Sequence, residues 1–144
     1  MSMTQHDCDE LGATCSWDLI DTNDGERHTF TGTLLGSASS HRTRHNHYKA
    51  TCNACRWFEV KIMLTEVDDG RCDYVVSYEG HTEVEGETLR RTVYRTRSPH
   101  TVIELLTQHR DGGPFIPRTS RLALSEAAGR DKGMEQAWVD RAVT

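Results

Sequence analysis

Residues 56–67 alternate between apolar and other side chains, and no other stretch of the chain restricts the fold as strongly. Successive side chains of a β-strand point to opposite faces of a sheet, so this period predicts a strand with one apolar face. That face would carry Phe58, Val60, Ile62 and Leu64. An Asp-Asp-Gly sequence at 68–70 is typical of a turn, and residues 72–79 alternate again. We therefore predict an antiparallel hairpin.

Further strands are expected on both sides of this hairpin. Residues 17–20 and 28–36 are separated by an Asp-Gly turn and are predicted to form a first hairpin. Residues 82–96 predict another strand, which Gly86 interrupts with a bulge or a turn.

The period of the apolar residues becomes helical after Ser98 and Pro99, which are typical of a helix start. The pattern predicts a helix at 99–109, an extended apolar anchor at 115–117, a second helix capped by Ser120 and a third helix at 133–143. Strands followed by helices, without β-α-β alternation, favour the α+β class.

The predicted fold is an antiparallel sheet of about four to five strands (residues 17–96) followed by two to three helices (residues 99–143). A chain of 144 residues suits one domain. We assign that domain to residues 16–144 and expect residues 1–15 to form a flexible acidic tail.

The net charge of −5 is unevenly distributed. Residues 1–26 hold seven acidic side chains and no Lys or Arg, so the remainder sums to +2, which is −5 minus −7. Fourteen of the seventeen basic residues are arginine, which favours bidentate pairing with carboxylates or phosphates. These arginines either pair with the surplus acids of the protein itself or contact a partner.

No run reaches the ~18 apolar residues that span a bilayer, and the N-terminus lacks the basic-then-apolar order of a secretory signal. We expect a cytoplasmic protein that does not enter a membrane. Five cysteines cannot all pair with one another, so we expect metal-bound or buried thiols.

Residues 41–55 concentrate three histidines and two cysteines in one polar connection. Cys52 and Cys55 have the spacing with which one turn presents two thiolates to a tetrahedral zinc ion, and His45 and His47 could complete the set. The sequence thus indicates a structural zinc ion as a candidate cofactor. The alternative is a pair of free thiols beside exposed histidines, because the order of these ligands matches neither a zinc finger nor a zinc ribbon.

These cysteines and histidines do not match the known enzyme signatures that contain such residues. A thioredoxin-like Cys-x-x-Cys opens a helix, whereas a strand pattern follows Cys55. A zinc deaminase places its His-x-Glu before the cysteine pair, whereas His81-Thr82-Glu83 comes after it. The chain contains no phosphate loop and no nucleophile elbow.

Basic and aromatic residues in and after this segment predict a binding surface. Arg42, Arg44, Tyr48 and Trp57 are the candidates, because arginine and aromatic side chains dominate binding hot spots. Trp57 faces away from the predicted apolar face, so we expect it to be more exposed than Phe58. Nucleic acid is an alternative partner, since bases stack on such rings, although the acidic N-terminal segment opposes it.

The string Cys-Asn-Ala-Cys-Arg-Trp-Phe-Glu-Val at 52–60 and the Gly-Pro-Phe-Ile-Pro sequence at 113–117 carry a resemblance. Over residues 41–130 the chain is similar to small proteins of unknown function encoded by bacteriophages of actinobacteria. The resemblance implies an accessory role in the cytoplasm of a host cell and assigns no catalytic residue.

We therefore expect a small non-enzymatic accessory protein that binds a host or phage macromolecule, most simply a protein, with a structural zinc as a candidate stabiliser. The alternative is a metal-dependent enzyme, or a binder, that acts on nucleic acid or nucleotides.

Overall fold

The computed structural model describes residues 10–40, 56–66 and 72–143. The strands are β1 (Thr14–Ile20), β2 (Arg27–Ser39), β3 (Arg56–Glu66), β4 (Cys72–Thr82), β5 (Arg90–Thr96), β6 (Gln108–Arg110) and β7 (Gly113–Phe115). The helices are α1 (Pro99–Leu105), α2 (Arg118–Ala128) and α3 (Lys132–Val143).

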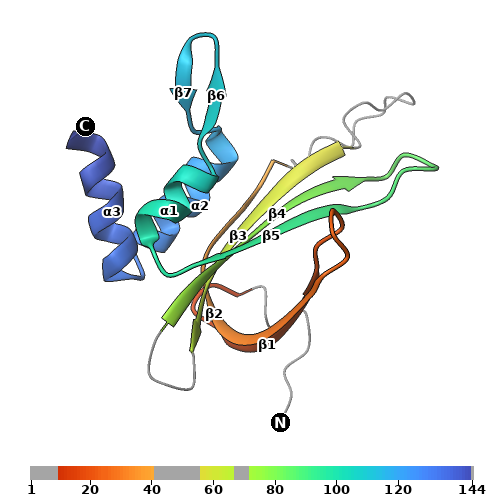
Figure 1. Cartoon of the computed structure of the whole chain (residues 1–144), viewed down its shortest axis with the longest axis horizontal. Coiled ribbons are helices and arrows are strands. Elements are labelled where there is room, and N and C mark those ends of the chain that lie inside the picture. Colours follow the sequence, from red (N-terminus) through yellow and green to blue (C-terminus); the bar gives the residue numbers. More distant parts are fainter. Residues whose placement is uncertain (1–9, 41–55, 67–71, 144) are drawn as a thin grey trace.

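The first five strands form one antiparallel sheet in the order β1-β2-β3-β4-β5. This confirms the predicted α+β fold with a sheet that precedes the helices. The long strand β2 pairs with β1 through its first half and with β3 through its second half. A register shift between Leu34 and Gly36 bends it, as a bulge does. The sheet therefore curls, with the helices on one side and the β1–β2 hairpin on the other (Figure 1).

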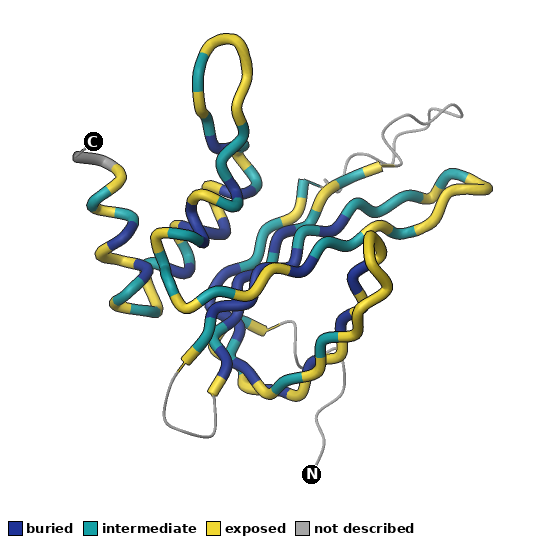
Figure 2. The backbone as a smooth tube through the Cα atoms, in the orientation of Figure 1, coloured by how far each residue is buried: buried dark blue, intermediate teal, exposed yellow. Residues whose placement is uncertain are grey.

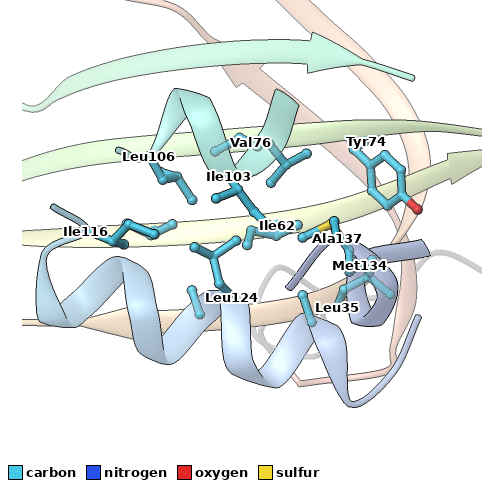
Figure 3. Close-up of a cluster of buried hydrophobic side chains, with 14 residues drawn as sticks. Leu35, Ile62, Tyr74, Val76, Ile103, Leu106, Ile116, Leu124, Met134 and Ala137 are labelled. Carbon is cyan, nitrogen blue, oxygen red and sulfur yellow. The ribbon is translucent and has the colours of Figure 1, made fainter. Parts of the chain in front are cut away.

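The helices cover one face of the sheet, which we call the outer face. Val60, Ile62 and Val76 from the sheet are fully buried there, and Figure 3 shows side chains from the three helices packed against this face. Leu124 of α2 and Met134 of α3 are also fully buried. The predicted anchor contributes Ile116, which joins the same core. Burial of these apolar side chains stabilises the helix layer on the sheet.

The opposite face, which we call the inner face, has a second core. The alternating residues Cys15, Trp17 and Leu19 of β1 pack against Met63 and Val75. The indole Nε1 of Trp17 donates a hydrogen bond to the carbonyl oxygen of Gly32 at 3.1 Å, so this buried ring leaves no polar atom unpaired. Both faces of β3 and β4 are therefore covered, and Figure 2 shows buried residues concentrated in the middle of the sheet.

A polar clasp closes the inner face at the end of β1. The buried carboxylate of Asp21 accepts a hydrogen bond from the backbone N–H of Val93 in β5 at 3.0 Å. The next residue, Thr22, strengthens the clasp. Its backbone N–H and its hydroxyl donate to the carbonyl oxygen of Arg91, and its hydroxyl accepts from the N–H of Arg91. The hydrogen bond from Val93 is the main reason that the pKa of Asp21 lies below its usual value. The clasp joins the first and last strands of the sheet.

Several boundaries differ from the prediction. The first helix ends at Leu105, and the predicted last turn is replaced by the β6–β7 hairpin, because the glycines at 112 and 113 favour a tight turn. Helix α2 begins at Arg118 with Pro117 at the cap position, and Ser120 is buried within its first turn. Strand β5 begins only at Arg90, since Gly86 lies in the turn before it. Strand β1 begins at Thr14, inside the predicted tail.

The contact between the sheet and the start of α3 gives a first testable prediction. The hydroxyl of Tyr74 donates to Asp131 Oδ2 at 2.6 Å, and the same oxygen accepts from the backbone N–H of Met134 at 3.0 Å. Replacing Tyr74 by Phe removes one bond to a charged group, so we expect the free energy of unfolding to fall by about 1–2 kcal/mol. Urea denaturation measures the change, and an unchanged midpoint would contradict this role of the hydroxyl.

Candidate functional site

Six polar side chains on the inner face form one group, which we call the inner-face network. They are Glu59, Lys61, Ser77, Glu79, His81 and Arg91. The register of the sheet brings them together: Glu59 lies opposite Glu79, and Glu79 lies opposite Arg91 on the next strand. Every member has an odd number, so strand alternation places all of them on the face of Met63 and Val75.

Glu79 is the buried centre of the network, with only 2% of the residue exposed. Its Oε2 accepts hydrogen bonds from Arg91 Nε at 2.6 Å and from Ser77 Oγ at 3.2 Å. Its Oε1 lies 2.9 Å from His81 Nε2. Burial by itself raises the pKa of this carboxyl group, but the bond from Arg91, the charges of Lys61 and Arg91 and the bond to His81 outweigh it and lower the pKa. Glu79 is therefore ionised at neutral pH.

Glu59 faces Glu79 across the strand pair, an arrangement in which two carboxylates repel each other. Lys61 offsets this repulsion, since its Nζ lies 3.0 Å from Glu59 Oε1. The second oxygen, Oε2, lies 3.8 Å from His81 Nε2. Lys61 also lies 5.8 Å from the ring centroid of Trp17, so the network continues directly into the second core.

The imidazole of His81 is held on two sides. Its ring stacks on Trp57 with the ring centroids 5.2 Å apart and the planes only 5° from parallel. An ionised carboxylate can only accept hydrogen bonds, so Nε2 of His81 carries the proton that bonds to Glu79. One ligand atom each from Glu59, Glu79 and His81 lies within 4.8 Å of the other two, a spacing at which the three can hold a metal ion.

A hollow of about 460 Å³ opens next to the network, at the end of the sheet that we call the sheet tip. Its lining residues are Arg56, Trp57, Phe58, Gly80, His81, Thr82, Gly86, Glu87, Thr88 and Arg90. The guanidinium of Arg56 makes two bonds to the carboxylate of Glu87, at 2.8 Å and 2.5 Å. These bonds and the hydroxyl of Thr82 lower the pKa of Glu87 to about 2.

The aromatic residues of the sheet tip lie on opposite faces, as predicted, but their exposure is the reverse of the prediction. Phe58 is 51% exposed, whereas Trp57 is half-buried. Phe58 does not belong to the outer core, and its only ring contact among the described residues is Tyr78, at 5.6 Å between centroids. Trp57 is covered by the parallel ring of His81. The alternation in the sequence correctly predicted the face of the sheet on which each ring lies. It could not predict which parts of those faces other segments cover.

Most residues of the sequence-based site lie outside the described residues. These are the zinc candidates Cys52, Cys55, His45 and His47, and the surface candidates Arg42, Arg44 and Tyr48. Trp57 is the described member of that set. Among the other cysteines, Cys15 is disulfide-bonded, so it is neither of the two states expected from the sequence, a metal-bound or a buried thiol. Cys72 is a free and exposed thiol.

The inner-face network was not found from the sequence, although a signal for it exists. A hairpin centred on Asp69 pairs residues whose numbers sum to 138, which places Glu59 opposite Glu79 and Trp57 opposite His81. Applying that register would have grouped these four side chains. The sequence by itself places His81 next to Glu83 and gives no spacing that links it to Glu59 or Glu79.

No protein-family model matches the chain, and no curated protein and no solved structure is significantly similar to it. The resemblance to actinobacteriophage proteins thus stays a prediction. Among the described residues, no helix is both long and apolar enough to cross a membrane.

Proposed function

We propose that the protein is a non-enzymatic accessory protein of phage type, which binds a protein partner through the sheet tip. The observation that carries the proposal is Phe58, a large apolar side chain that is 51% exposed at the sheet tip, where the stacked rings of Trp57 and His81 occupy the opposite face. Aromatic side chains next to arginine are the usual hot spots of protein interfaces, and Arg56 and Arg90 line the same hollow.

The predicted binding segment joins the fold at this tip. The backbone N–H of Ser40 donates to the carbonyl oxygen of Phe58 at 2.8 Å, and the hydroxyl of Ser40 accepts from the N–H of Phe58. Ser40 and Arg56, which precede and follow residues 41–55, are therefore close to the exposed ring. This supports one continuous contact surface that includes Arg42, Arg44 and Tyr48.

A protein partner is favoured over nucleic acid because Arg56 at the tip and Lys61 near it are already paired. Arg56 binds Glu87, and Lys61 binds Glu59, so neither offers an uncompensated charge to phosphate. Glu83 and Glu85 in the adjoining turn add negative charge. Electrostatic binding to nucleic acid needs several unpaired cations, which the described part of the tip does not supply.

The test compares two exposed apolar residues on different parts of the molecule. Phe58→Ser removes the proposed contact, and Leu122→Ser on α2, where Leu122 is 49% exposed, is the matched control. Loss of an aromatic hot spot costs about 2 kcal/mol or more, so retention of a partner from an actinobacterial lysate should fall more than about tenfold for Phe58→Ser only. Equal retention by both variants contradicts the proposal, and retention that nuclease abolishes would favour the nucleic-acid alternative.

A further inference from the structure

From the geometry of the inner-face network we infer that Glu59, Glu79 and His81 bind one divalent metal ion of the zinc class. This site is separate from the cysteine and histidine set predicted at 45–55, and it does not depend on partner binding. The three ligand atoms come from adjacent strands and lie within 4.8 Å of one another. Two carboxylates and one imidazole are a ligand set that suits zinc and related first-row ions.

The orientation of the two carboxylates is the strongest argument. Each has an outer oxygen that is held by a donor: Oε2 of Glu79 by Arg91 and Ser77, and Oε1 of Glu59 by Lys61. The inner oxygens, Oε1 of Glu79 and Oε2 of Glu59, both point toward Nε2 of His81, at 2.9 Å and 3.8 Å. Ligating carboxylates in metal sites are fixed in the same way by hydrogen bonds to the oxygen that does not bind the metal.

The proposed ion would occupy the place of the proton on Nε2 of His81. Nε2 donates this proton toward the inner oxygen of Glu79, and a metal ion between the three atoms takes its place. An imidazole that binds a metal through Nε2 is neutral and carries its proton on Nδ1. The two carboxylates therefore supply the only ligand charge. Stacking on Trp57 fixes the ring plane, which limits the entropy lost on binding.

The charges around the site determine what else it would bind. Lys61 and Arg91 already balance Glu59 and Glu79, so a bound divalent ion leaves the site with a net charge of about +2 at close range. His81 also lines the hollow of the sheet tip, so the site borders that hollow. Three protein ligands leave one position of a tetrahedral ion open. The ligand that fits the open position is a small anion.

The experiment measures Zn²⁺ binding by isothermal titration calorimetry in the Cys52→Ser/Cys55→Ser chain, which removes the thiolates of the other candidate set. We expect one ion per chain. Loss of an outer hydrogen-bonding partner costs about 10–100-fold in metal affinity, so loss of a ligand through Glu59→Gln or His81→Gln should cost at least about 100-fold. Glu85→Gln, an exposed residue of the neighbouring turn, should leave the affinity unchanged.

A second probe avoids the cysteine variants altogether. Mn²⁺ prefers carboxylate oxygens to thiolates, so the unchanged chain should bind it at this site, and Glu59→Gln should abolish this binding. The decrease of the free-ion signal in electron paramagnetic resonance measures it. Absence of binding with both ions, or affinities that Glu59→Gln and His81→Gln leave unchanged, would show that the network is only a set of ion pairs and would overturn the inference.

Discussion

Replacing Gly36 by Ala is expected to lower the free energy of unfolding by about 3 kcal/mol or more. Gly36 is buried where β2 passes under α2, and a Cβ atom at this position would lie 2.1 Å from the carbonyl oxygen of Ala123. That oxygen belongs to helix backbone, which cannot move aside as a flexible side chain would. The helix must therefore shift away from the sheet and lose contacts of Ala123 and Ala127 with the outer core.

Urea denaturation of Gly36→Ala measures this loss. The matched control is Gly112→Ala in the β6–β7 turn, where a Cβ meets nothing within 4 Å. Its stability should stay the same or rise by up to about 1 kcal/mol, because alanine restricts the unfolded chain. Similar denaturation midpoints for Gly36→Ala and the unchanged protein would mean that α2 does not pack this closely on β2.

Glu79→Gln is expected to cost about 3 kcal/mol, because the amide leaves the guanidinium of Arg91 half-buried without its counter-charge. The amide also replaces one carboxylate oxygen by an NH2 group, which meets either the donors of Arg91 and Ser77 or that of His81. Glu85→Gln makes the same chemical change at an exposed position and should shift the stability by no more than about 0.5 kcal/mol.

The pH dependence of the free energy of unfolding distinguishes the contribution of the charge of Glu79 from that of its side-chain shape. Its pKa in the folded protein is below the ordinary value of 4.5, so the folded state holds its proton less tightly than the unfolded state does. The resulting stabilisation is fully present above pH 4.5 and is lost as the pH falls through the folded pKa. Denaturation midpoints between pH 6 and pH 3 should therefore decline more steeply for the unchanged protein than for Glu79→Gln. Parallel curves would contradict the role of the charge.

The elements that the sequence predicted well are those with a strong local signal. The period of two at 56–67 and the Ser-Pro helix start at 98–99 need no information from elsewhere in the chain. Exposure was predicted less well, because the cover over a strand comes from distant segments. Met63 is completely buried beneath β1, whereas Phe58 lies outside the outer core and is exposed.

The candidate site required a different kind of information. Glu59, Glu79 and Arg91 come from three strands, and only the register between those strands places them in one group. In the sequence alone, each is an ordinary polar residue on the less apolar face of a strand. The inference of a metal site therefore rests on the structure, whereas the binding surface at 42–57 was proposed from residue types.

The bond between Asp21 and Val93 also affects the order in which the molecule can assemble. It joins residues 72 positions apart, whereas β3 and β4 are neighbours in the chain. Contacts of long separation carry the larger cost of loop closure, so they form after the local ones. A folding chain can complete β2 to β5 and its helices and still have Met63 and Val75 open to water. In this sense the docking of β1 over the inner face is the last step, and the inner core excludes water only once Asp21 has reached β5.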